Sequence, residues 1–154
     1  MITPYELPEI KDHSFFFIDQ RIATHIEAKL HKHDAWELYH VIHGHGNRIA
    51  GDTLQPFSAG DVVLIPPSMH HYWQYAPTSA DNDGCIHYLM VAFSHSLITR
   101  CIEVFPELRN RLTSLTFPVN ALKYGLESSR VIRKILSQMN DMDDLGRLSA
   151  MFRL

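Results

Sequence analysis

Short apolar stretches, several of them with alternating hydrophobic and polar positions, follow one another between residues 14 and 94. Turns rich in glycine, aspartate and asparagine separate them, as at Gly51-Asp52 and Gly60-Asp61. Short strands at such regular spacing are typical of a β-sandwich or barrel. The predicted strands are, in order, 14–19, 22–30, 37–42, 48–50, 53–57, 62–65, 71–75 and 85–93.

The two ends of this β region differ in pattern. Residues 1–13 contain two prolines and little periodicity, which predicts an irregular lead-in. A turn near Asp19-Gln20 would join the first two strands as an opening hairpin. The run from Cys85 to Phe93 is mostly apolar, so we expect a strand that is buried on both faces and is the last strand of the barrel.

The hydrophobic spacing becomes helical from His95 onward. One helix should end or restart at Pro106, because proline cannot donate the amide hydrogen bond. A second helical face consists of Val131, Ile132, Ile135, Leu136 and Met139, and after a break at Asn140-Asp141 it continues as Met142, Leu145, Leu148 and Phe152. The sequence therefore predicts two antiparallel helices after the barrel. We expect one domain overall, with the barrel in residues 1–94 and a helical extension in residues 95–154.

Length and composition fit one globular domain. The 154 residues are 45% hydrophobic and 20% charged, and no run approaches the roughly 18 apolar residues of a membrane span. The N-terminus has no signal-peptide pattern, which makes the cytoplasm the expected compartment. A net charge of -3, with 14 Lys and Arg spread along the chain, argues against direct contact with nucleic acid. Cys85 and Cys101 lack metal or redox spacing and should be small hydrophobic residues.

Side chains suited to metal binding lie in two segments of this pattern. Alternate residues of an extended strand share a face, so His31 and His33 point the same way, and Glu37 and Tyr39 keep that parity. The second segment, residues 60–71, predicts a turn, a buried strand and a rigid Pro-Pro bend, followed by His71. Two imidazoles and a carboxylate should therefore converge on one pocket, where His71 can add a third imidazole.

The spacing within the two segments matches two known motifs. The pattern His-x-His-x3-Glu-x6-Gly is met by His31, His33, Glu37 and Gly44, and Gly-x5-Pro-x-small-x2-His is met by Gly60, Pro66, Ser68 and His71. Together they resemble the two motifs of the cupin superfamily. The resemblance implies a mainly β fold, a cupin (double-stranded β-helix or jelly-roll) barrel, followed here by C-terminal α-helices. His25 replaces a usual glycine and Tyr75 a usual asparagine, both at turns or strand ends and not at ligands.

The chain looks most like the N-terminal sensor domain of AraC-family transcription regulators. The resemblance lies in the residues of the second motif, Gly-Asp-Val-Val-Leu-Ile-Pro-Pro-x-x-x-His, and in the tail that contains Phe105-Pro106-Glu107-Leu108. This resemblance covers roughly the whole chain. It implies a small-molecule effector, such as a sugar or sugar acid, inside the barrel. It also implies that DNA is bound by a separate C-terminal domain that this chain does not include.

The candidate site has two interpretations. Three imidazoles and a carboxylate suit one divalent transition metal such as Zn, Fe, Mn or Ni, with His31, His33, Glu37 and His71 as ligands. The alternative is a polar pocket without metal, lined by the same four residues together with Tyr39, Trp73 and Tyr75. These aromatic side chains share an inward parity, although in small barrels they are more often plain core. Arg48 could hold a carboxylate or hydroxyl bidentately if its strand turns it inward, but an arginine beside a glycine-rich hairpin is usually solvated.

Three functions fit these features. The first is the sensor and dimerisation domain of a transcription regulator, with no catalytic residue. The second is a small metal-dependent cupin enzyme, such as a dioxygenase, isomerase or lyase, that uses the same four residues. The third is a storage or scaffold cupin with an empty barrel. Because no further acid or base with pocket parity stands out, the sensor is favoured over the enzyme.

The apolar stripe that ends at Leu154 supports two further expectations. No capping residue follows it, so the natural protein is expected to continue. The same stripe, together with Val131, Ile135 and Met139, could pair with its copy about a two-fold axis. We therefore expect a homodimer with the helical tail at its centre.

Overall fold

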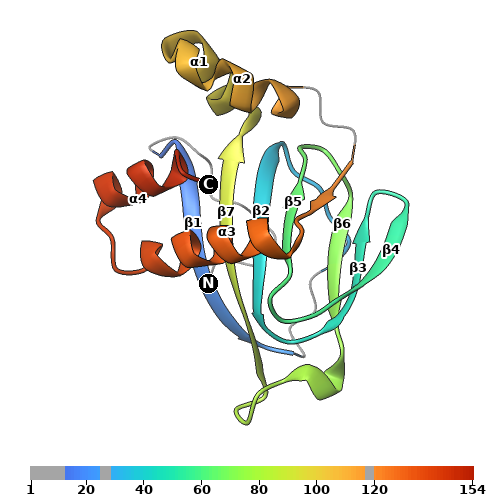
Figure 1. The fold of residues 1–154 in the computed structure, drawn as a ribbon. Helices are drawn as coiled ribbons and strands as arrows, with labels where there is room; N and C mark the ends of the chain where they lie inside the picture. The colour runs from blue at the N-terminus through green and yellow to red at the C-terminus, as the bar shows by residue number, and fades with distance from the viewer. Residues whose placement is uncertain (1–12, 25–28, 117–119) are drawn as a thin grey trace.

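The computed structural model describes residues 13–24, 29–116 and 120–154, and its strands form two antiparallel sheets (Figure 1). The five-stranded sheet has the order β1 (Phe15–Ala23), β7 (Cys85–Ser94), β2 (Ala35–His43), β5 (Val62–Ile65) and β8 (Leu122–Lys123). The three-stranded sheet has the order β4 (Thr53–Phe57), β3 (Gly46–Ala50) and β6 (His71–Tyr75). The strands predicted from residue 37 to residue 93 are confirmed to within a few residues at each end.

Two hydrophobic cores lie on either side of the five-stranded sheet. One lies between the two sheets and contains Tyr39, Val63 and Met90 from the larger sheet with Phe57 and Trp73 from the smaller one. The other lies between the outer face of the larger sheet and the helices. Both faces of β2 and β7 are therefore covered, which explains their nearly continuous apolar sequences.

The predicted opening hairpin is wrong. Strand β1 runs without a turn through Asp19 and Gln20, and it pairs with β7 from Phe15 opposite Phe93 to Ala23 opposite Cys85. The polar side chain of Asp19 has partners there, because His87 Nε2 on β7 lies 2.6 Å from its Oδ1. Polar residues that suggested a turn thus belong to a strand. Of the predicted strand 22–30, residues 22–23 end β1 and residues 29–30 lie outside any strand, whereas residues 25–28, like the lead-in residues 1–12, lie outside the described residues.

A two-residue strand, β8, was not predicted, so β7 is not the last strand of the chain. Val63 pairs with Lys123 and Leu64 with Leu122. The ammonium group of Lys123 also contacts Asp61 Oδ2 at 2.7 Å. A strand of two residues, one apolar and one charged, is too short to show a hydrophobic period. Only its pairing with β5 defines it.

The helices that follow β7 form two groups (Figure 1). Helix α1 (His95–Val104) and the short α2 (Arg109–Leu112) lie beyond one end of the sheets, whereas α3 (Leu126–Met139) crosses the outer face of the larger sheet. Helix α4 (Asp144–Met151) turns back after the predicted break and contacts α3. Its N-cap Asp143 accepts a hydrogen bond from the amide of Gly146 at 2.8 Å. No helix in the described part of the chain is long and apolar enough to cross a membrane.

Most of the predicted apolar face of α3 packs on this protein's own sheet. Ile132, Ile135, Leu136 and Met139 are buried in the core beneath the helices, whereas Val131 is 59% exposed. Ile135 and Met139 therefore cannot contribute to a surface for a second copy. Neighbouring residues of a helix point about 100° apart, so a face that is centred on Leu136 turns Val131 outward.

Candidate metal centre and barrel interior

Backbone pairing brings together two histidines that are distant in the sequence. His31 and His71 form an isolated antiparallel bridge, in which the His31 amide donates to His71 O at 3.1 Å and the His71 amide donates to His31 O at 2.8 Å. Their rings lie 4.3 Å apart. The segment before β2 is thus fixed against the start of β6.

The bend between β5 and β6 fixes the position of His33. The Ser68 amide donates to His33 O at 2.8 Å, and Ser68 has a positive φ of 61°. Such a φ is uncommon for a residue with a side chain, so tertiary contacts must hold this turn. The predicted Pro-Pro bend is confirmed, and it returns the chain toward the first motif.

All four predicted metal ligands lie in one cluster. One donor atom from each of His31, His33, Glu37 and His71 lies within 4.8 Å of the others. The Oε2 atom of Glu37 is 3.0 Å from His33 Nε2 and 3.2 Å from His71 Nε2. Glu37 and His71 are buried, while His31 and His33 are partly exposed. The cluster therefore has a closed inner side and an open outer side.

Backbone carbonyls orient two of the imidazoles from behind. His31 Nδ1 donates to Lys29 O and His71 Nδ1 donates to Met69 O, both at 2.9 Å. A neutral imidazole that donates through Nδ1 carries its lone pair on Nε2. Histidines that bind metals in proteins are commonly held in this way.

Burial and hydrogen bonding shift the pKa values of the cluster in opposite directions. Burial alone would raise the pKa of Glu37, but the hydrogen bonds from His33 and His71 lower it to about 2. Burial would lower the pKa of His71, yet the hydrogen bond and charge of Glu37 raise it above 6.5. At His31 burial has the largest effect and lowers the pKa. At neutral pH Glu37 is an ionised carboxylate and His31 a neutral imidazole, the forms that bind metals.

The donor set fits a divalent transition metal. Two ligands that are each 2.0–2.2 Å from a metal and at right angles lie about 3 Å apart, which is close to the two distances from Glu37. Three imidazoles and one carboxylate suit Zn, Fe, Mn or Ni. If such an ion is bound, these four residues would hold it and it would supply a Lewis acid with positions open to a ligand.

Aromatic side chains fill the space between the sheets next to this cluster. The rings of Tyr39 and Trp73 stack at 4.1 Å, and those of Tyr39 and Tyr88 at 4.6 Å. The hydroxyl groups of Tyr39 and Tyr75 share a hydrogen bond of 3.0 Å. Burial raises the pKa of both phenols, so they are neutral. The predicted inward orientation of Tyr39, Trp73 and Tyr75 is confirmed, whereas their contact with a ligand stays a prediction.

The solvated position expected for Arg48 is wrong. Its side chain points into the space between the sheets and is only 2% exposed. The guanidinium carbon lies 5.3 Å from the centre of the Trp73 ring. Parity with Gly46 and Ala50 was the available signal, since two small residues on the same face leave room for a long side chain.

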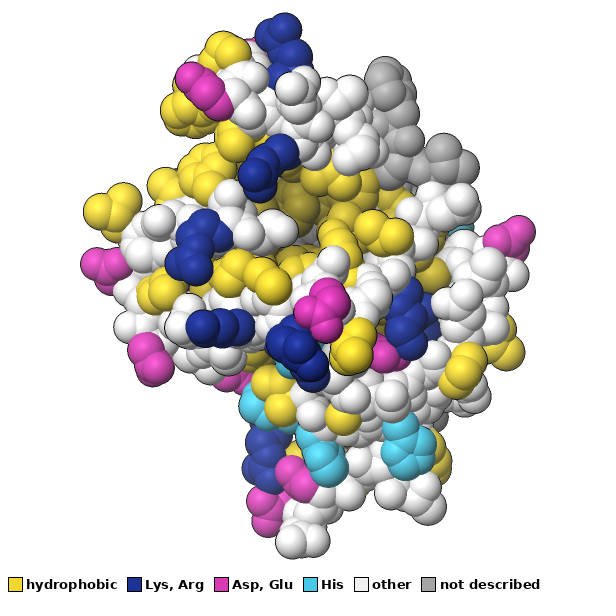
Figure 2. Space-filling view, in the orientation of Figure 1, with side chains coloured by type: hydrophobic (Ala, Val, Ile, Leu, Met, Phe, Trp, Pro, Cys, Tyr) yellow, Lys and Arg dark blue, Asp and Glu magenta, His cyan; other side chains and the backbone are white. Residues whose placement is uncertain are grey.

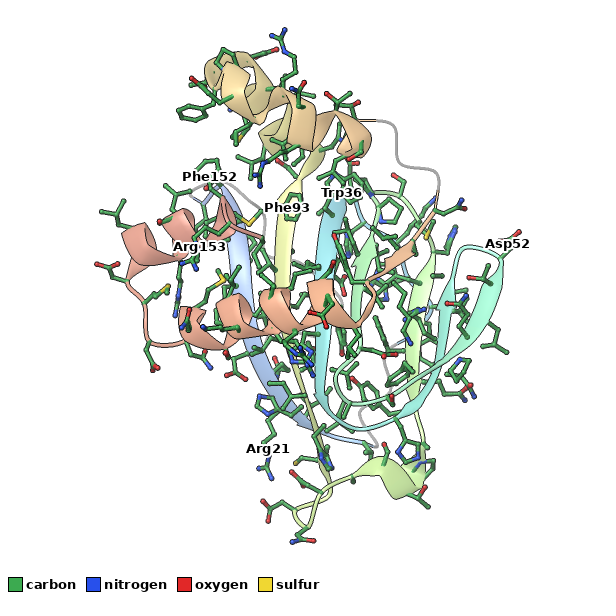
Figure 3. The ribbon with its side chains drawn as sticks, viewed as in Figure 1. Arg21, Trp36, Asp52, Phe93, Phe152 and Arg153 are labelled. Carbon is green, nitrogen blue, oxygen red and sulfur yellow. The ribbon has the colours of Figure 1, made fainter. Side chains whose placement is uncertain are left out.

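Trp36 and His87, two further aromatic side chains of the barrel strands, lie away from the cluster. Trp36 is on the opposite face of β2, in the core beneath the helices, where it stacks on Phe93 at 6.3 Å (Figure 3). His87 is bonded to Asp19 near the surface. Neither residue faces the space between the sheets.

Comparison with known proteins identifies the family. A model of the AraC-like ligand binding domain matches residues 12–154. The chain belongs to this family. Its fold is a cupin-type barrel followed by C-terminal helices, as the motifs predicted.

Two solved structures illustrate what this chain is similar to. Apo ToxT from Vibrio cholerae is 13% identical, with a TM-score of 0.51 over 92% of this chain and 55% of that chain. A cupin 2 domain-containing protein from Halorhodospira halophila is 20% identical, with a TM-score of 0.44 over 55% of each chain. The chain thus spans about half the length of each. A search of curated proteins found no match.

Proposed function

We propose that this AraC-like domain is the effector-sensing domain of a cytoplasmic transcription regulator. The match to the family over residues 12–154 carries the proposal. The effector is a small polar molecule, sugar-like in size and hydroxyl content, that binds in the barrel between His33 and Tyr39. Its binding changes how a separate DNA-binding domain is presented, because a ligand shifts a conformational equilibrium by its differential affinity.

A screen for ligands by thermal shift tests the sensor proposal. A ligand that binds only the native state raises Tm by mass action, so neutral sugars and sugar acids should be screened in parallel. Affinity should fall in His33→Ala and in Tyr39→Phe, which removes only the hydroxyl that bonds to Tyr75. A confirmed ligand whose affinity is the same in both variants would place the effector site elsewhere.

We further propose that His31, His33, Glu37 and His71 hold one divalent transition metal. The carbonyl contacts behind His31 and His71 support this, because they direct the lone pairs on Nε2. Elemental analysis of protein purified without added metal should show about one ion per chain, and much less in His33→Ala and His71→Ala. His45→Ala, at an exposed position, is the control. Equal metal content in all four proteins would rule out the site.

Because all four candidate metal-binding residues are present, an enzyme remains the second candidate function. A small metal-dependent cupin enzyme, such as a dioxygenase, isomerase or lyase, would use the same four residues, and sensor domains need no metal to bind an effector. Turnover of a carbonyl or phenolic substrate by the metal-loaded protein, lost in His71→Ala, would favour the enzyme.

A homodimer through the helical side is the last part of the proposal. The side chains of Leu145, Val131 and Phe152 are 75%, 59% and 46% exposed. Figure 2 shows apolar side chains gathered in a hollow between the α1–α2 segment and α3. Exposed apolar groups on adjacent helices are a suitable surface for a second copy.

A further inference from the structure

The buried guanidinium of Arg48 has too few partners. Its Nη2 donates to Gln55 Oε1 at 2.6 Å. Its Nε and Nη1 have no hydrogen-bond partner among the described residues, and neither atom is accessible to water. A carboxylate partner would be expected, because buried charges in proteins are normally paired.

No carboxylate in the described structure neutralises this charge at hydrogen-bond distance. The charge of Asp61 acts on Arg48 only from a distance, and its Oδ2 is already bonded to Lys123 at 2.7 Å. Burial lowers the pKa of Arg48, although an arginine stays protonated at physiological pH. Among the described residues this cation therefore lacks a carboxylate partner, although its guanidinium carbon lies 5.3 Å from the centre of the Trp73 ring.

The neighbouring indole adds a further donor. Arg48 and Trp73 are direct cross-strand partners in β3 and β6, and Gln55 is the partner of Arg48 on β4. The Nε1 atom of Trp73 is buried and, like the two arginine nitrogens, has no acceptor among the described residues. Three donors on paired residues that have no partner among the described residues favour an oxyanion as the missing partner. A carboxylate offers two oxygens to the planar guanidinium fork.

The position of this pair fits the proposed effector site. Trp73 follows His71 by two residues on the same face of β6, which places the pair about 7 Å along the strand from the histidine cluster. Gln55 itself is exposed, because β4 is an edge strand of the smaller sheet. Because Arg48 Nε and Nη1 are closed to solvent, a ligand reaches the arginine only when the aromatic side chains between the sheets move aside.

We propose that Arg48 and Trp73 form an anion subsite that binds the carboxylate of the effector. The proposal rests on the sensor function above and narrows it from sugar-like molecules in general to small carboxylic acids. A neutral sugar would leave the guanidinium uncompensated. Gln55 holds the guanidinium in place through its side-chain oxygen and is a positioning residue.

Matched pairs of acid and neutral ligands test the subsite. Glucuronate with glucose, galacturonate with galactose, and acetate as the smallest carboxylate are measured by thermal shift at constant ionic strength against sodium chloride. The acids should raise the Tm of the wild type, and the neutral sugars should bind more weakly. Arg48→Met should weaken binding of the acids about tenfold or more, since it removes charge-assisted hydrogen bonds. Arg48→Lys, which keeps the charge and loses the fork, should give an intermediate affinity.

A stability measurement makes the test independent of the ligand's identity. Without ligand, Arg48→Met should melt at or above the wild-type Tm, because the variant removes an unpaired buried charge. Arg130→Met, at an exposed position of α3, is the matched control and should change neither stability nor binding. A clear fall in the Tm of ligand-free Arg48→Met would show that the arginine is a structural element, and it would overturn the proposal.

The remaining outcomes separate the subsite from the sensor function. Neutral sugars that bind as tightly as the acids, with no effect of Arg48→Met, would overturn the subsite and leave the effector site standing. No Tm rise with any carboxylate, or an equal rise in wild type and Arg48→Met, would also overturn the subsite. Binding of acids that requires Arg48 but is unchanged in His33→Ala and Tyr39→Phe would support the subsite and contradict the pocket proposed between the motifs.

Discussion

Replacement of Glu37 by glutamine tests whether its buried charge stabilises the fold. Glu37 is 4% exposed and accepts hydrogen bonds from His33 and His71. Glutamine keeps the size of the side chain but removes the charge. In metal-free protein, prepared with EDTA, Glu37→Gln should therefore lose the charge-dependent part of these interactions and little packing.

The size of the effect follows from the pKa of Glu37. Its pKa is about 2 in the folded protein, compared with an ordinary value of 4.5. At about 1.4 kcal/mol per pH unit, this difference contributes about 3 kcal/mol to the free energy of unfolding. A carboxyl group with a lowered pKa gives its full contribution above pH 4.5, and the contribution is lost as the pH falls toward 2. About 1 kcal/mol should remain at pH 3.

Urea denaturation of wild type and Glu37→Gln at pH 6 and pH 3 measures this contribution. The difference in the free energy of unfolding should be about 3 kcal/mol at pH 6 and about 1 kcal/mol at pH 3. Glu127→Gln, at an exposed position of α3, is the control and should change the free energy little at either pH. A difference that is the same at both pH values would refute the electrostatic explanation and point to packing.

Three further substitutions test the fold and the assembly. Gly46→Ala should lower the free energy of unfolding by about 3 kcal/mol, because an added Cβ would lie 1.9 Å from the carbonyl oxygen of Gln74; Gly125→Ala, with open space around its Cβ, should be tolerated. Leu136→Ala in the core beneath α3 should cost about 2–5 kcal/mol in urea denaturation, and a cost below 1 kcal/mol would contradict its full burial. Leu145→Glu should dissociate the proposed homodimer in sedimentation experiments without a loss of stability, and a wild type that is monomeric at high concentration would exclude the dimer.

The cluster of three histidines and one glutamate could be predicted from sequence because most of its pattern is local. Fixed spacing places His31, His33 and Glu37 on one side of an extended segment, and the Pro-Pro bend returns the chain to His71. The structure adds what spacing cannot give. The carbonyls of Lys29 and Met69 orient two of the rings, and these contacts depend on the folded backbone and not on residue type.

The amino-acid sequence by itself determined the β region with its helical tail, the positions of most strands and the identity of the four clustered side chains. Hydrophobic periodicity records which residues share a face of a strand or helix. It does not record which other element covers that face. Only the tertiary structure decided that Asp19 lies within a strand, that Ile135 and Met139 pack on this protein's own sheet, and that Arg48 points inward. Each of these facts depends on contacts between segments that are distant in the sequence, and such contacts form only when the two sheets and the helices pack together.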